Sequence, residues 1–191
     1  EKFDKFIIEG KKKYVGKTGE VYKLVGVECI KRDTVTIASE FQRELIELLM
    51  DKSPIIKLRK WVINKRKILF KEEIPKEKII IYKKLTKSPE AYKGKSGKAY
   101  TAPVHVRIAK SLKERKIGGG NKVTLFSSGT IIPYIVIGKE KNGQIQGVHI
   151  LEYKGNFDRG YYWSNLVYPP LKRLLETIHQ NVDWTIYEES Y

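Results

Sequence analysis

A basic triplet closed by an aromatic residue, Lys11-Lys12-Lys13-Tyr14, is the group whose residue types and spacing best suggest a binding role. It lies at the edge of a predicted β-hairpin, where strand alternation would place Lys12 and Tyr14 on one face and Lys11 and Lys13 on the other. A lysine and a tyrosine that project together suit a duplex minor groove: the lysine can donate to base acceptors, and the tyrosine can contact a sugar or phosphate. The alternative is an edge strand that its lysines protect against aggregation, and the motif alone leaves both open.

The charge balance of the whole chain indicates a polyanionic partner. The 191 residues include 38 Lys and Arg against 22 Asp and Glu, so the formal net charge is +16 and the pI is near 9.7. Nucleic acid is the first expectation. No membrane partner is expected, because no stretch approaches ~18 uncharged apolar residues. The single cysteine, Cys29, excludes a disulfide framework and a thiolate metal site and favours a reducing compartment.

Patterns that would support catalysis or metal binding are weak. Gly16-Lys-Thr18 and Gly94-Lys-Ser96 imitate phosphate-binding loops, but each lacks the glycine required five positions earlier. The three histidines have no second ligand at helical or hairpin spacing. The aspartates are isolated, whereas two magnesium ions would need them paired on adjacent strands. We therefore expect no catalytic residue, no metal site and no cofactor in this chain.

The elements expected to position the basic motif form a small sheet at the start of the chain. Strands are predicted over 3–8, 13–15 and 21–30, with a glycine turn at 16–19. Further elements follow from helical stripes, proline and glycine signals and β-branched runs. The first helix is predicted after Asp33 or Thr34, with Ile37, Phe41, Leu45 and Leu48 on one stripe, and the next three run from Pro54 to about Phe70, from Val104 to near 118–120, and over 161–180, where Pro169-Pro170 interrupt the last. Strands are predicted over 78–82, 123–126 and 131–137. A polar loop is predicted over 83–100 and a turn at Asn142-Gly143. The second of these helices is rich in lysine and arginine.

Short sequence blocks in a fixed order carry a family resemblance. The opening blocks are Glu1-Lys-Phe3, Phe6-Ile-Ile8, Gly10-Lys-Lys-Lys-Tyr14 and Val25-Gly-Val-Glu-Cys-Ile-Lys-Arg-Asp33. The later ones are Leu85-Thr-Lys87, Tyr92-Lys93, Val104-His-Val-Arg-Ile-Ala-Lys110, Gly129-Thr-Ile-Ile-Pro-Tyr-Ile135, and Tyr161-Tyr162 with Pro169. In order and spacing they resemble the palm edge, with its KKxY motif, and the thumb of family B DNA polymerases, over nearly the whole chain.

The resemblance implies a fold and a set of contacts. The fold would be α+β, with palm-edge strands over 1–33 and a mostly helical thumb with a small β subregion over 34–191. In the family, the KKxY lysine and tyrosine approach the primer-template duplex near the primer end, which implies this role for Lys12 and Tyr14, with Lys11 beside them. Phosphate contacts of the thumb are implied for Arg32, Lys87, Lys93, Thr101, His105 and Lys110. His105 departs from the pattern, because its usual preceding proline is displaced to Pro103, so a structural role at the helix start is an equal expectation.

The same resemblance implies a partner. The family's metal-binding aspartates, nucleotide-binding helix and exonuclease lie upstream of the KKxY motif, so magnesium is expected in a separate large catalytic chain and not here. Some archaea encode the enzyme as two polypeptides, and Glu1 stands near where such a break would fall. We therefore expect a small subunit or fragment that binds primer-template DNA in the cytoplasm, at the nucleoid. The rival is a stand-alone, non-catalytic duplex-binding protein.

Overall fold

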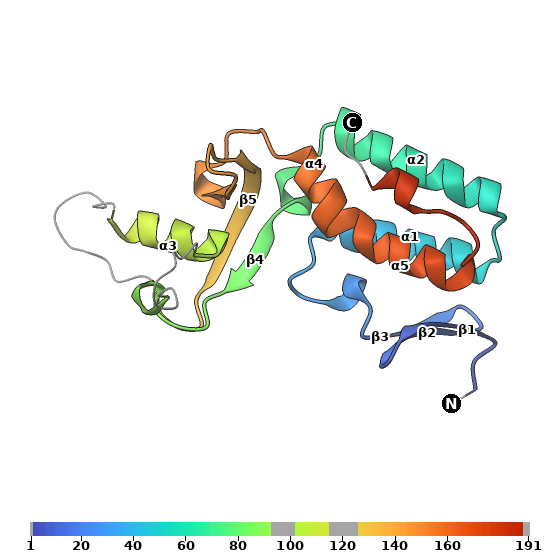
Figure 1. Cartoon of the computed structure of the whole chain (residues 1–191). Coiled ribbons are helices and arrows are strands. Elements are labelled where there is room, and N and C mark those ends of the chain that lie inside the picture. The colour runs from blue at the N-terminus through green and yellow to red at the C-terminus, as the bar shows by residue number, and fades with distance from the viewer. Residues whose placement is uncertain (1, 93–101, 115–125, 189–191) are drawn as a thin grey trace. The chain divides into compact units, whose positions relative to one another are not determined.

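Two antiparallel three-stranded sheets and the helices beside them make up the described residues, 2–92, 102–114 and 126–188, of the computed structural model (Figure 1). The chain forms two compact units by contact, one from residues 1–79 and 159–191 and one from residues 80–158. The α+β prediction is confirmed. The predicted boundary after residue 33 separates the palm edge from the thumb. The two compact units follow a different criterion, the contacts between residues, so the predicted boundary stays a prediction.

The first sheet has the order β1-β2-β3, from β1 (Lys5–Gly10), β2 (Lys13–Thr18) and β3 (Val21–Val25). Ile7 pairs with Val15 on the buried face, where each is at most 5% exposed. The turn predicted at 16–19 is wrong, because β2 continues to Thr18 and the chain reverses at Gly19 and Glu20. Gly19 takes a φ of 57°, and its N–H donates to Asp4 Oδ2 at 2.8 Å.

The strand predicted over 21–30 ends early. Gly26, at a φ of 65°, turns the chain out of the sheet, and Glu28–Ile30 form a 3-10 turn. The buried Cys29 donates its backbone N–H to Gln42 Oε1 at 2.6 Å. Gln42 is fully buried and also donates to Pro170 O at 3.4 Å. A tertiary hydrogen bond thus replaces the ladder bond that a longer strand would have made.

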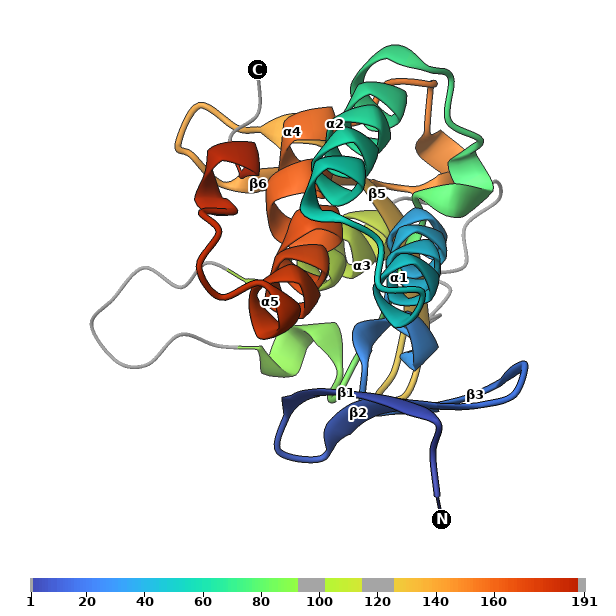
Figure 2. The same cartoon turned by 90° about the vertical axis from the view of Figure 1, so that its right-hand side faces the viewer.

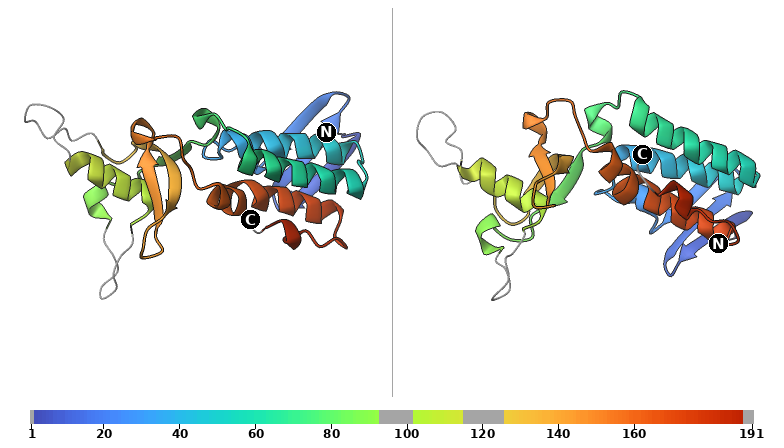
Figure 3. Two further views of the ribbon diagram at one scale, coloured as in Figure 1. Left: turned by 90° about the horizontal axis from the view of Figure 1, so that it is seen from above. Right: turned by 45° about the horizontal axis from the view of Figure 1, so that its top comes forward.

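Helices α1 (Thr36–Met50), α2 (Ile55–Lys71) and α5 (Tyr168–Ile178) lie side by side above the first sheet (Figures 1, 2 and 3). The predicted stripe of α1 is confirmed for Ile37, Phe41 and Leu45, whereas Leu48 is only half-buried. Trp61 of α2 meets Phe41 edge-on, with ring centroids 6.4 Å apart. The predicted second helix is confirmed, with Pro54 at the position just before its first residue and without a side-chain capping hydrogen bond.

The final predicted helix continues through Pro169-Pro170 without a break, and the interruption expected there is a change of helix type just before the prolines. A short helix α4 (Arg159–Tyr161) continues into a π-helical segment, Tyr162–Val167, before α5 begins. Prolines have no N–H to donate to carbonyls one turn back, which favours a wider turn at this place. The segment buries Trp163, whose ring stacks on Tyr168 at 5.2 Å and whose Nε1 donates to Tyr187 O at 2.7 Å.

The second unit contains the sheet β4-β5-β6, from β4 (Ile81–Lys84), β5 (Ile131–Lys139) and β6 (Ile145–His149), with α3 (Val104–Glu114) packed on it. The strand predicted at 78–82 therefore starts later, after a 3-10 turn at Lys76–Lys78. The Asn142-Gly143 turn is confirmed, with Gly143 at a φ of 79°. The glycines at 118–120 and nearly all of the strand predicted at 123–126 lie outside the described residues.

Substituting Gly26 tests how the end of β3 supports the basic hairpin. A Cβ here would lie 2.4 Å from the carbonyl oxygen of Lys12, in addition to the strain of a positive φ. Gly19→Ala is the matched control, because Gly19 has a similar φ and nothing within 4 Å. We expect Gly19→Ala to lower the unfolding free energy by about 1–2 kcal/mol and Gly26→Ala to lower it by about 1–3 kcal/mol more, measured by urea denaturation. Equal losses would show that the turn does not rest on Gly26.

Candidate nucleic-acid interface

The basic motif occupies the tip of the β1–β2 hairpin. Gly10 pairs with Lys13, so Lys11 and Lys12 form the connecting turn and both are exposed. Lys12 has a φ of 61°, in the left-handed region that non-glycine residues seldom adopt. The predicted alternation of Lys11 and Lys12 across strand faces is therefore wrong, because turn residues do not follow the strand period. The two side chains instead project from the end of the hairpin.

Lys13, the third lysine of the motif, serves the fold. Its ammonium lies 3.8 Å from Glu9 and 3.7 Å from Glu28. Arg173 of α5 joins the same network, with Nε 3.0 Å from Glu9 and an Nη 3.4 Å from Glu28. Lys11 and Lys12 have no acidic partner among the described residues, so these two are available to an external anion.

Tyr14 is oriented by an aromatic cluster on the outer face of the first sheet. Its ring centroid lies 5.3 Å from that of Phe6 and 6.3 Å from that of Phe3, and the two phenylalanines stack on each other. Gly16 makes room for this arrangement, because a Cβ there would lie 2.4 Å from the Phe3 ring. The Tyr14 hydroxyl makes no hydrogen bond within the described part of the chain. The cluster thus fixes the ring and leaves a donor for a ligand.

Arg32 belongs to the same unit and is exposed in the segment between the 3-10 turn and α1. Its neighbour Lys31 is held by Glu28 at 2.7 Å. Arg32 is therefore the outward-facing cation of this pair, as its predicted phosphate contact requires.

In the second unit the structure brings Lys87 and Tyr92 together. The Lys87 ammonium lies 4.9 Å from the Tyr92 ring centroid. Thr86 donates its backbone N–H to the Tyr92 hydroxyl at 3.0 Å, and its own hydroxyl lies 2.9 Å away. These hydrogen bonds from Thr86, together with the charge of Lys87, lower the pKa of Tyr92. Two predicted blocks, Leu85-Thr-Lys87 and the Tyr92 block, therefore form one surface.

The turn at residues 128–130 supports this surface through hydrogen bonds to Leu85 and Thr86. The sequence did not predict that these two segments meet. Leu85 is buried, donates its N–H to Thr130 O at 2.8 Å and accepts from Gly129 N at 2.7 Å. Ser128 Oγ donates to Thr86 O at 2.9 Å. The Gly129 block was part of the resemblance, so the block order carried the signal, but only the fold shows that the two segments touch.

Helix α3 places His105 and Lys110, both of which are half-buried. Burial lowers the pKa of His105 below its usual 6.5, and the positive charge of Lys83 lowers it further. The imidazole is therefore neutral at pH 7, and it can offer a hydrogen bond to a phosphate but no charge. Lys93 and Thr101 lie outside the described residues, so their predicted contacts stay predictions.

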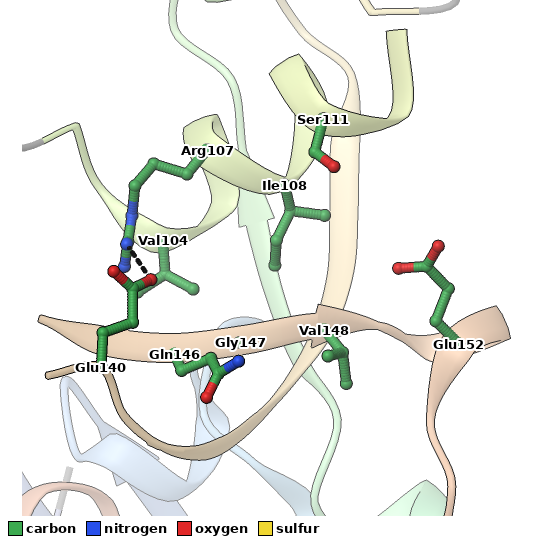
Figure 4. A pocket seen from close by; sticks show the side chains of 9 residues that line it. All are labelled: Val104, Arg107, Ile108, Ser111, Glu140, Gln146, Gly147, Val148 and Glu152. Carbon is green, nitrogen blue, oxygen red and sulfur yellow. Dashed lines mark hydrogen bonds and ion pairs between the residues drawn. The ribbon is translucent and has the colours of Figure 1, made fainter. Parts of the chain in front are cut away.

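Arg107, between these two residues, holds the helix to the β5–β6 hairpin. Its guanidinium donates to Glu140 at 2.7 Å and to Gln144 at 2.9 Å, and also to Ile145 O. A groove of about 230 Å³ runs beside it between α3 and β6 (Figure 4). Gly147 at the groove lies against Val104, because a Cβ there would come within 2.5 Å of that side chain. The guanidinium of Arg107 is thus used within the fold and not for a ligand.

A metal site and a membrane-spanning helix are both absent from the described residues. Within ranges 2–92, 102–114 and 126–188, no group of three His, Cys, Asp or Glu side chains could hold a metal ion. Across the same ranges, no helix is both long and apolar enough to cross a membrane.

Comparison with known proteins gives a consistent family. Residues 1–178 match the family described as DNA polymerase family B. The chain is 33% identical over 179 residues to the DNA polymerase of Methanocaldococcus jannaschii, and 32% identical over 158 residues to that of Thermococcus gorgonarius. These matches cover 92% and 78% of this chain but only 10% and 18% of those proteins.

A solved structure agrees with the sequence matches. It is that of the family B DNA polymerase from the hyperthermophilic archaeon Pyrobaculum calidifontis, with a TM-score of 0.62 and 25% identity over 87% of this chain and 20% of that one. This chain therefore spans about a tenth to a fifth of the length of these relatives. With a family match over 178 residues and a shared fold, the chain belongs to DNA polymerase family B.

Proposed function

We propose that this chain is the palm-edge and thumb part of a family B DNA polymerase, a small subunit or fragment that binds primer-template duplex and completes the enzyme with a separate catalytic chain. The observation that carries the proposal is the hairpin tip, where Lys11 and Lys12 are unpaired beside a Tyr14 held by its aromatic neighbours. Nucleotidyl transfer, and the magnesium it needs, are assigned to the catalytic chain.

The hairpin residues would act near the primer end. A lysine in a turn can reach into the minor groove, whose acceptors differ little between base pairs, so contact there grips the duplex without selecting sequence. Tyr14 has its ring fixed and its hydroxyl free to donate to a sugar or phosphate oxygen. Lys12 and Tyr14 would therefore contact the duplex only when the primer end is correctly positioned.

The remaining contacts would be distributed along the phosphate backbone. Arg32 and Lys87 are exposed cations, and Lys87 is steadied by the Tyr92 ring. Each cation that neutralises a phosphate releases a condensed counterion, which makes the affinity steeply salt-dependent. His105, neutral at pH 7, would contribute a hydrogen bond at most, and this favours its alternative role at the start of α3.

The second candidate is a stand-alone duplex-binding protein without a catalytic partner. The charge of +16 and the unpaired hairpin lysines would be sufficient for this function. The two candidates differ in whether the chain forms a stable complex and alters polymerisation.

Reconstitution separates these candidates. The chain is mixed with a candidate large chain that carries the catalytic aspartates, and extension of a labelled primer is measured with each alone and with both. We expect no extension from this chain alone and longer products from the mixture than from the large chain alone. If the large chain is equally active and processive by itself, and gel filtration shows no complex, the subunit proposal is wrong.

Lys12→Ala and Tyr14→Phe should act at the primer end more than on total affinity. In the reconstituted enzyme we expect each to slow extension and to shift the balance toward proofreading, with duplex affinity reduced less than about tenfold, since only one contact among several is lost. Single-nucleotide extension and exonuclease rates are measured separately. Lys141→Ala, an exposed lysine in the β5–β6 turn, is the control. Wild-type values for both hairpin variants would exclude the minor-groove role.

Lys87→Ala tests the distributed phosphate contacts. The affinity falls as salt rises, and losing one contact should make this fall less steep, by about 0.9 in the slope of log affinity against log salt on a B-form duplex. Sequence preference should not change. Fluorescence anisotropy with a labelled duplex between low and moderate salt gives the slope. Lys141→Ala again controls for the loss of one charge in the same unit. A Lys87→Ala slope no lower than that of the control would remove Lys87 from the interface.

A further inference from the structure

Helix α2 carries a basic face that the hairpin and thumb contacts do not use. Its 17 residues, Ile55–Lys71, include seven lysines and arginines and no aspartate or glutamate. Five of the cations are exposed: Lys57, Arg59, Lys60, Lys67 and Lys71. Surface helices ordinarily mix both signs of charge, so a single-sign face of this length calls for a partner.

The outward direction of these charges follows from helix geometry. The buried side chains of α2 are Leu58, Val62 and Leu69, and they define its inner stripe. At 100° per residue, Lys60, Lys67 and Lys71 lie on the opposite side of the helix. Lys60 and Lys71 are eleven positions apart, so at 1.5 Å per residue the line of lysines is about 16 Å long.

Internal pairing does not neutralise this line. Lys65, on another side of α2, lies 2.5 Å from Glu44 and over the Phe41 ring, so its charge is used inside the unit. Lys60, Lys67 and Lys71 have no acidic partner in the described part of the chain. Their side chains therefore present uncompensated charge to solvent.

The charge pattern also disfavours the helix itself. Lys67 and Lys71 are a like-charge pair four residues apart, which is destabilising in a helix. Lys57 lies in the first turn, where the helix dipole favours acidic residues, and that turn contains none. A bound polyanion would offset both the repulsion between Lys67 and Lys71 and the unfavourable charge of Lys57. Binding of a polyanion to α2 would therefore explain its charge pattern.

The length of this line matches the phosphate spacing of nucleic acid. Each strand of duplex DNA carries one phosphate per 3.4 Å of rise, so a 16 Å line passes about five of them. Ile56 and Ile63 are 70% and 52% exposed and lie along one flank of the line. An acidic protein helix would bury these two side chains, whereas phosphate contacts leave them in water.

This face lies away from the KKxY hairpin within the same unit. The first sheet contacts α1 and α5, and α2 lies on the far side of α1 from the sheet (Figures 1 and 2). The lysine line points outward from α2, opposite to its buried stripe. A straight duplex held at the hairpin tip would therefore not also lie along this face.

We propose that the outward face of α2, defined by Lys60, Lys67 and Lys71, is a second nucleic-acid contact that binds the phosphate backbone of a segment other than the one at the hairpin. It requires neither a catalytic chain nor the primer-end role of Lys12 and Tyr14.

The test uses the complete chain and two triple variants with equal loss of charge. K60Q/K67Q/K71Q removes the lysine line, and K139Q/K141Q/K154Q removes three exposed lysines that have no assigned role. Anisotropy with a labelled 20-base-pair duplex is measured over a salt series. We expect the slope of log affinity against log salt to become less steep by about 2.7 for the α2 variant and by less than about 1 for the control. The α2 variant should melt at the same temperature or higher, because repulsion is removed.

Two further arms decide the outcome. K11Q/K12Q tests the hairpin independently: because a short duplex does not reach both surfaces, this variant should leave the α2-dependent change in slope intact, and the combined variant should lose both binding events. Equal slopes for the α2 variant and the control would overturn the proposal, since only net charge would then matter. If the α2 variant keeps wild-type duplex binding while I56S/I63S abolishes binding of labelled poly-L-glutamate, the face takes an acidic protein and the proposal is wrong.

Discussion

The ion pair between Arg173 and Glu9 is the interaction on which the basic hairpin depends. Glu9 exposes only 2% of its side chain, and its partner stands 164 residues later, in α5. A buried carboxylate that lost its cation would be strongly destabilising, so the first strand and the last long helix are tied together. Glu28 and Lys13 extend the network to the base of the turn, and this holds the hairpin tip in place.

Internal pairing also decides which of the many cations can meet a polyanion. Lys13, Lys65 and Arg107 each have an acidic partner within their own unit. Within the described ranges, the outward cations that the proposals use lie at the hairpin tip, at Arg32, beside Tyr92 and along α2. The charge of +16 therefore indicates the kind of partner, whereas the pairing selects the surfaces.

The elements predicted well are those with long, regular patterns. Helices α1 and α2 have stripes of large apolar residues, and burial of those stripes dominates their formation. Errors occur where tertiary contacts override the local pattern. The strand at 21–30 is cut short because Cys29 bonds to Gln42, and the π-helical segment forms where prolines and the burial of Trp163 meet. The alternation predicted for Lys12 fails because Lys12 lies in the turn between β1 and β2, where it has a positive φ and its carbonyl lies close to Gly26.

The sequence by itself determined the family, the α+β class, the basic character and the residues of the KKxY motif, because block order and composition are local properties of the chain. Only the tertiary structure decided that Lys11 and Lys12 form a turn, that Lys13 belongs to an ion network and that Lys87 meets Tyr92. The turn and the Lys87–Tyr92 contact join residues close in the sequence, but distant residues hold both: Arg173 joins the network of Lys13, and Ser128 bonds to Thr86. Such contacts are set by how buried faces pack, which no short pattern encodes.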